Sequence, residues 1–164
     1  MKNILDKAMK EIHLYRNDIE KKLLEFAKTD LLFFWGEKRD LYMRQQKEWQ
    51  PILEWVEDLA KVEVAKTNNL SVPDNSKLQQ PLAKIFAAMD DKELACYYAA
   101  TLNMKSVLLA LALVKGRIDA KKAGELSYLE EIWQNEMWGT DSEAEKRRKD
   151  RCNELTIIES FLKK

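Results

Sequence analysis

The sequence predicts an all-α fold, an orthogonal bundle of about six helices packed around one central apolar helix at residues 94–115. Three observations lead to this prediction. Apolar residues recur at steps of three and four along most of the chain, which is the spacing of one face of an α-helix. Only four Gly and three Pro interrupt the 164 residues, which favours long helices over many short strands. Residues 94–115 are apolar on nearly every side, so other helices must surround them.

Length and composition indicate one globular helical domain, expected to span residues 1–164. The chain is long enough to bury a core, and its 46% hydrophobic and 34% charged residues are typical of a folded protein. Lys plus Arg and Asp plus Glu both total 28, which argues against a general nucleic-acid-binding protein. The longest apolar run, Val107–Val114, is far shorter than the roughly 20 residues of a membrane span, so no membrane insertion is expected.

Two long helices are predicted in the first third of the chain. The first has one apolar face, formed by Leu5, Ala8, Ile12, Tyr15, Ile19, Leu23 and Phe26. The second has another, formed by Leu41, Gln45, Trp49, Ile52, Val56 and Leu59. Because Pro51 lacks a backbone donor, we expect it to kink or restart this second helix. Gln45 and Trp49 share a face, and we interpret them as a core Trp with a Gln at its rim.

The remaining elements follow from capping and turn signals. Residues 62–75 are polar and indicate a surface connection, and residues 78–89 a short helix. Asp90 or Asp91 is expected to cap the central helix, which ends at Gly116. Asp119 is expected to cap the next helix, which would run to Gly139. Thr140-Asp141 then caps a final helix that is charged in its first half and apolar in its second.

The last turns before Gly139 contain the most informative stretch of the chain. At about 100° per residue, Leu126, Leu129, Trp133 and Met137 form one stripe, which we interpret as core. Glu131, Gln134 and Trp138 form a second stripe on the opposite side. A Trp exposed beside charged and polar groups is a common anchor for a protein partner. Packing of Trp138 against a neighbouring helix is the alternative interpretation.

Catalytic and cofactor motifs are not recognisable in the sequence. It contains no phosphate-binding glycine loop, no CxxC and no HExxH, so neither a cofactor nor a metal site is expected. His13 is the only histidine and stands without a catalytic constellation. Lys146-Arg147-Arg148-Lys149 is flanked by acidic residues, which favours paired charges on a solvated face over nucleic-acid contact. Cys96 and Cys152 fit reduced thiols inside apolar helices.

Several stretches, in order, resemble the Atp-twelve family, assembly chaperones of F1-ATP synthase that bind its free α subunit. The resemblance covers roughly residues 18–148 and rests on five pieces. These are Thr29-Asp30-Leu31-Leu32, Gln45-x-x-x-Trp49-x-Pro51-Ile52-Leu53-x-Trp55, Glu93-Leu94-Ala95, Ser106-Val-Leu-Leu-Ala-Leu-Ala-Leu-Val-x-Gly116-Arg117 and Ser127-x-Leu129-x-Glu131-x-Trp133-Gln134-x-x-x-Trp138-Gly139. The last piece is the most specific.

The resemblance implies a non-catalytic chaperone that holds the free F1-ATPase alpha subunit until the ring of α and β subunits assembles. It implies an essential acidic residue in the terminal motif, which we assign to Glu131, with Glu130 next. Trp138 would then be the apolar anchor for the partner, and Gln134 would form a hydrogen bond to the partner. Structural support is expected from Trp133, Gly139, Gln45, Trp49 and Asp30. Family members also carry an N-terminal β-rich domain, which we expect to be absent from residues 1–164.

Two other functions are consistent with the pattern. One is a homo-oligomerisation or protein-interaction scaffold in which the Glu131 and Trp138 face meets its own copy. The other is a small enzyme or ligand-binding bundle with an apolar pocket lined by Tyr97, Tyr98 and Trp133. Because catalytic motifs are absent, we favour a protein that is not an enzyme and has no small-molecule substrate. Its expected location is the cytoplasm in a bacterium and the mitochondrial matrix in a eukaryote.

Overall fold

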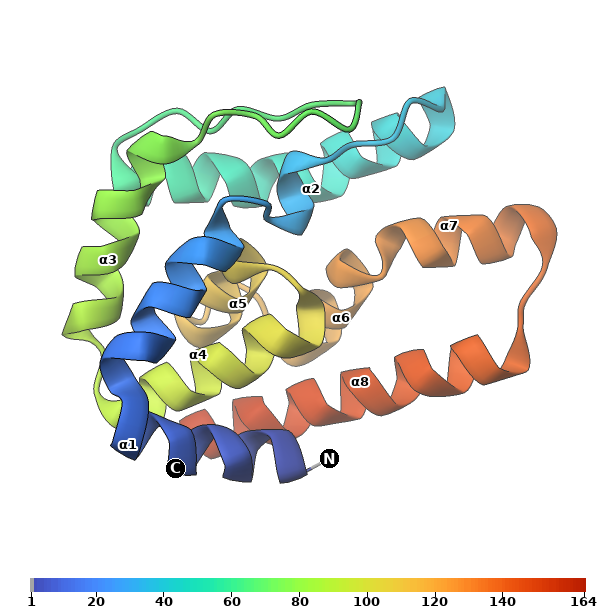
Figure 1. Ribbon diagram of the computed structural model, residues 1–164. Coiled ribbons are helices and arrows are strands. Elements are labelled where there is room, and N and C mark those ends of the chain that lie inside the picture. Colours follow the sequence, from blue (N-terminus) through green and yellow to red (C-terminus); the bar gives the residue numbers. More distant parts are fainter. Residues whose placement is uncertain (1) are drawn as a thin grey trace.

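The computed structural model describes residues 2–164, and within this range the chain forms eight α-helices and two short 3-10 turns (Figure 1). Between these residues the only β pairing is one isolated bridge from Phe34 to Thr67. The prediction of an all-α fold is therefore confirmed. The helices are α1 (Lys2–Ala27), α2 (Arg39–Ala60), α3 (Gln79–Ala88), α4 (Asp91–Met104), α5 (Val107–Val114), α6 (Ala120–Ser127), α7 (Leu129–Trp138) and α8 (Ser142–Leu162).

α5 lies at the centre of the bundle and is buried on all sides. Each residue from Val107 to Leu113 is inaccessible or nearly so. Figure 1 shows α5 almost end-on in the middle of the molecule, and it contacts α1, α2, α4, α6 and α8. α4 lies beside it and buries most of its own side chains. The apolar stretch without a polar face therefore occupies the centre of the fold, as its pattern predicts.

The central element is two helices rather than the single helix predicted for residues 94–115. α4 ends at Met104 and is followed by Lys105, whose φ of 57° is left-handed. Ser106 then caps α5 by accepting a hydrogen bond from the Leu109 amide at 3.0 Å. The fully buried Asp30 carboxylate accepts hydrogen bonds from Ser106 Oγ at 2.7 Å and from the Leu108 amide at 3.0 Å. This distant acid satisfies the donors that the break frees, and the apolar pattern gives no sign of it.

A second break separates α6 from α7, so the predicted single helix up to Gly139 is also wrong. Tyr128, with φ −106° and ψ 19°, lies between the two helices. Asp119 caps α6 as predicted, through a hydrogen bond from the Lys122 amide at 2.8 Å. The two breaks account for eight helices in the described part of the chain where about six were expected.

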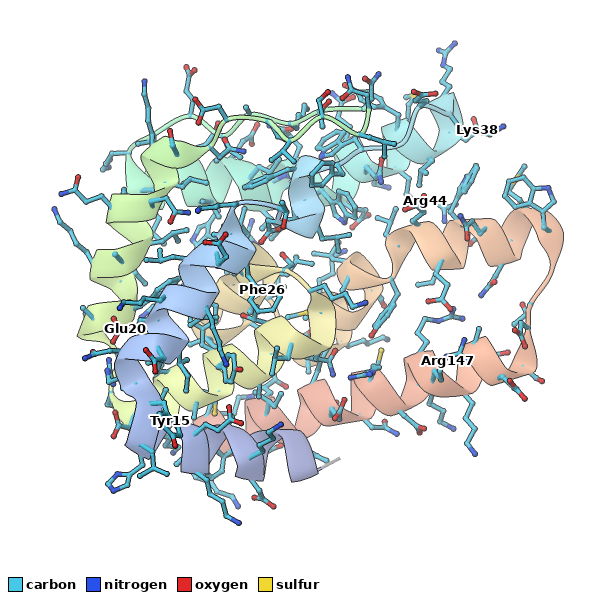
Figure 2. The ribbon with its side chains drawn as sticks, in the orientation of Figure 1. Tyr15, Glu20, Phe26, Lys38, Arg44 and Arg147 are labelled. Atoms are coloured by element: carbon cyan, nitrogen blue, oxygen red, sulfur yellow. The ribbon has the colours of Figure 1, made fainter. Side chains whose placement is uncertain are left out.

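The first two long helices depart from prediction at particular residues. α1 has non-helical angles at Tyr15, and the Tyr15 side chain is exposed on the outside of this kink (Figure 2). α2 runs through Pro51 without restarting, and Pro51 is exposed on its outer side. Gln45 is buried in the core rather than at its rim. Phe26 and Leu59 are exposed rather than part of the predicted apolar faces.

Residues 61–75 form the predicted surface connection, which is tied down at two places. Thr67 exchanges backbone hydrogen bonds of 2.8 Å with Phe33 and Trp35. Asn75 holds both backbone groups of Ala65, accepting at 2.7 Å and donating at 2.9 Å. Within residues 2–164, no helix has the length and apolar character needed to cross a membrane.

Candidate functional site

The residues singled out for partner binding lie on α7, at the edge of the bundle. Figure 1 shows α7 and the first half of α8 extending to the right of the other helices, joined by a turn at the far end. We call residues 129–151 the arm. Leu129 and Trp133, which is 5% exposed, face the body of the protein. Met137 was predicted to lie in the core, but it is 53% exposed, because the last turn of α7 extends past the helices that could cover it.

Trp138 is the last residue of α7 and is 67% exposed. Its ring stands edge-on to that of Trp133, with centroids 5.5 Å apart and planes at 89°. The helix closes at Gly139, whose φ of 94° is one that other residues rarely adopt. Trp138 is therefore oriented by one contact inside its own helix, while most of its indole surface remains open to solvent.

Glu130, Glu131 and Gln134 line one hollow beside α7, together with Leu31, Trp49 and Tyr128. Glu130 and Gln134 are exposed, and Glu131 is about one third exposed. The Glu131 carboxylate lies 3.4 Å from a guanidinium nitrogen of Arg148 on α8. That nitrogen forms no aligned hydrogen bond, so the pair is a loose one. The structure thus gathers three of the predicted residues and places Trp138 at the end of the same helix.

The predicted supporting residues connect the elements beneath this hollow. Trp49 Nε1 donates to the Leu126 carbonyl at 2.9 Å, which joins α2 to α6 just before α7 begins. Gln45 Oε1 accepts from the Gly36 amide at 2.8 Å. Asp30 also caps the 3-10 turn Leu31–Phe33 by accepting from the Leu32 amide at 3.0 Å. Burial raises the pKa of Asp30, although its hydrogen bonds favour the charged form.

Two residues of the site were not found from the sequence. Tyr128 lines the hollow at the break between α6 and α7, and burial raises its pKa to about 12. Its hydroxyl donates to the Asn103 carbonyl at 3.5 Å. Arg148 belongs to the basic run, but its pairing with Glu131 depends on how the arm folds back. The break at Tyr128 could not be read from the helical spacing, which continues across it.

The opposite side of α7 also borders a groove, with α2 and α6 as its other walls. Its apolar lining includes Met43, Leu126, Leu129 and Ile132, and its volume is about 760 Å³. The Lys122 ammonium lies 2.6 Å from Glu48, and the Arg44 guanidinium 2.7 Å from Glu136. These two ion pairs connect α2 to α6 and to α7.

The three residues proposed to line an enzyme or ligand pocket are all buried in the core. Tyr97 is fully buried, its ring lies 5.2 Å from that of Phe86, and its hydroxyl donates to the Val107 carbonyl at 3.0 Å. Tyr98 is buried, and Trp133 packs against Trp138. Within residues 2–164, no group of His, Cys, Asp and Glu is arranged to hold a metal ion.

An all-α bundle whose projecting helix exposes an indole near carboxylates and an amide has the features of a helical protein-interaction module. The sequence model described as ATP12 chaperone protein matches residues 1–57. In structure the chain is similar to Atp12 from Paracoccus denitrificans, with a TM-score of 0.88 and 27% identity over 94% of this chain and 67% of that one. The resemblance to the ATP12 chaperone family is therefore confirmed in both sequence and fold.

Two further solved structures agree with this resemblance. A point mutant of the Paracoccus denitrificans protein gives a TM-score of 0.87 at 26% identity, covering 94% of this chain and 67% of that one. A protein of Agrobacterium tumefaciens, described as a candidate chaperone, gives 0.82 at 26% identity, covering 95% and 59%. The family model and the Agrobacterium tumefaciens protein are both described as chaperones, a class of protein that is not catalytic.

Proposed function

We propose that this chain is an assembly chaperone that binds the free α subunit of F1-ATPase through α7 and masks its interface before the ring of α and β subunits forms. The likeness to the ATP12 chaperone family supports an assembly role. The observation that carries the binding site is Trp138, an exposed indole at the end of a helix that also presents Glu130, Glu131 and Gln134.

The chemistry of this face suits temporary cover of an unassembled subunit. A subunit that lacks its neighbours exposes a large apolar surface that would otherwise aggregate. An aromatic anchor supplies much of the energy of a protein interface, while surrounding polar groups determine orientation. Glu131 is already solvated in part and only loosely paired with Arg148, so exchanging this partner for one on the bound subunit has a small energetic cost.

The test is capture of purified free α subunit by immobilised wild type, Glu131→Gln and Glu131→Lys. Glu131→Lys puts two positive charges side by side at Arg148, and we expect it to weaken capture more than Glu131→Gln does. Glu54→Lys is the matched control, because Glu54 is exposed but belongs to a different helix, α2. Equal capture by all four proteins, each shown to be folded by circular dichroism, would exclude Glu131 from the site.

Self-association through α7 is the second candidate, because an exposed Trp138 could equally meet its own copy. Light scattering after size-exclusion chromatography separates the two functions. The scaffold requires a stable dimer that Trp138→Ala dissociates. The chaperone requires a chain whose Trp138→Ala variant keeps its mass and loses affinity for the α subunit.

A further inference from the structure

A second hollow, of about 310 Å³, lies on the side of the arm where α7, α8 and the end of α4 approach one another. It shares Leu31, Ser127, Tyr128 and Glu131 with the hollow described above. Its other lining residues include Leu102 and Asn103 of α4 and the side of α8 that carries Arg147, Arg148 and Arg151. Figure 2 labels Arg147 on the part of α8 that runs opposite α7.

The lining of this hollow is strongly cationic in a chain whose net charge is zero. Lys105, Arg147, Arg148 and Arg151 contribute four positive charges, and Glu131 is the one carboxylate in the lining. Among the described residues, neither Lys105 nor Arg147 takes part in an ion pair. Arg148 is paired loosely with Glu131 at 3.4 Å, and Arg151 lies 3.7 Å from Glu154. The basic run at residues 146–149 therefore presents part of its charge to a concave surface. The prediction that its charges are paired on a solvated face holds only in part.

One buried polar atom in the lining also lacks a partner. Asn103 is 4% exposed, and its Nδ2 donates to the Arg151 carbonyl and to Glu154 Oε2, both at 2.9 Å. These two bonds fix the orientation of the amide, and its Oδ1 is buried without a hydrogen bond. A buried acceptor left without a donor is unfavourable, and this one is closed off from solvent, so an N–H group reaches it only when the side chains around it move.

We infer that this hollow receives an acidic segment of the bound protein partner, with a carboxylate held by Arg147, Arg148 and Arg151. Guanidinium groups bind carboxylates through two parallel hydrogen bonds, and several on one wall favour a segment with more than one acid. Leu102, exposed at the rim, and Leu31 provide apolar contact for the residues between those acids. On binding, the loose Glu131–Arg148 ion pair would separate. Arg148 would then pair with an acidic group of the partner, and Glu131 with a basic group of the partner. This inference rests on the proposed chaperone function.

The first experiment measures affinity for free F1 α subunit at low and physiological salt. The test variant carries Arg147→Glu and Arg151→Glu. The matched control carries Lys146→Glu and Lys149→Glu, which reverse as many charges on exposed positions of the same helix that do not line the hollow. We expect the test variant to lose at least about tenfold in affinity and the control to lose less than about threefold. Equal losses would overturn the inference while leaving the chaperone function in place.

The second experiment is independent of the α subunit. Arginine side-chain NMR signals of the whole chain are followed during titration with a blocked peptide of repeated Leu-Glu-Glu, and with its Leu-Gln-Gln counterpart. We expect the acidic peptide alone to shift Arg147, Arg148 and Arg151, and the Arg147→Glu, Arg151→Glu variant to show no response. Equal shifts with both peptides, or shifts with inorganic phosphate but not with the acidic peptide, would overturn the inference. If wild type binds no α subunit, the proposed function fails and this titration alone decides the inference.

Discussion

The centre of the bundle and the arm are built from helices of similar length, yet they are held in different ways. α5 is buried along its whole length, and the break before it is satisfied by the Asp30 carboxylate from a distant segment. α7 is attached by Leu129 and Trp133 on one side, and its charged groups pair across to α2 and α8. The centre therefore depends on burial and complete hydrogen bonding, and α7 on two buried side chains and two partly solvated ion pairs.

This contrast explains why the candidate site is on the arm. A surface that binds a partner must leave polar and apolar groups available, and a fully packed helix has none to offer. The arm retains an open indole, a carboxylate that is about one third exposed, and a row of arginines because few helices cover it. Substitutions in the two regions should accordingly separate loss of stability from loss of binding.

The largest expected effect is on the residue that attaches the arm. Trp133→Ala should lower the free energy of unfolding by about 4 kcal/mol, because it removes a large buried side chain and leaves a cavity. Trp138→Ala, five residues later on the same helix, should change it by less than about 0.5 kcal/mol, because that indole is mostly solvated. Urea denaturation followed by circular dichroism measures both. Similar losses would mean that Trp138 is also part of the core.

Asp30→Ala should lower the free energy of unfolding by roughly 3 kcal/mol, because it leaves the Leu32 and Leu108 amides and the Ser106 hydroxyl without their buried acceptor. Asp18→Ala is the control, since Asp18 is exposed on α1. A small loss at Asp30 would show that α4 and α5 remain separate helices without this carboxylate.

The loss at Asp30 should also depend on pH. Burial raises the pKa of Asp30 from its ordinary value of 3.8, so the native chain binds this proton more tightly than the unfolded chain. The carboxyl group therefore makes wild type less stable as pH rises from the unfolded pKa through the native one. The difference between wild type and Asp30→Ala should be largest in acid and smaller at neutral pH. A difference that grows with pH would contradict the direction of this shift.

A smaller effect is expected where α6 and α8 approach closely. A Cβ at Gly124 would lie 2.6 Å from Cys152 Sγ, so Gly124→Ala requires the Cys152 side chain or the helix that carries it to shift. We expect a loss of about 1 kcal/mol, because overpacking outweighs the better helix propensity of Ala. Adding Cys152→Ala should restore most of it, judged against Cys152→Ala alone in thermal unfolding. No rescue would place the strain elsewhere.

The smallest effect concerns the ion pair between Arg44 and Glu136, which links α2 to α7 at 2.7 Å. A double-mutant cycle with Ala at both positions should give a coupling of about 0.5 kcal/mol that decreases with added salt, because both side chains are partly solvated. A coupling several times larger would mean that charge, and not Trp133, holds the arm in place.

Much of the fold followed from the sequence, because helical spacing and caps act over a few residues. Asp90, Asp119 and Asp141 cap the helices as expected, and the all-α class follows from the apolar periodicity. The breaks at residues 105 and 128 did not follow, because the apolar pattern continues through both. The first is set by Asp30, more than seventy residues away in sequence, which no local pattern can indicate.

The site was predictable in part for the same reason. Glu131, Gln134 and Trp138 lie on one helix, so their spacing was enough to place them near one another. Arg148 and Tyr128 complete the surroundings of Glu131 through contacts between helices, and these depend on the angle at which the arm folds back. Met137 was misassigned because spacing identifies the face of a helix but not where the neighbouring helices end.

The edge-on pair of indoles at the end of α7 has an optical consequence. At 5.5 Å, the strong far-ultraviolet transitions of the Trp133 and Trp138 rings are close enough to couple, so we expect the far-ultraviolet circular dichroism of the chain to contain a contribution that requires both rings. A ligand that settles on Trp138 alters one member of the pair while the other stays fixed in the interior. The chain thus contains a built-in spectroscopic reporter of occupancy, readable without any attached dye.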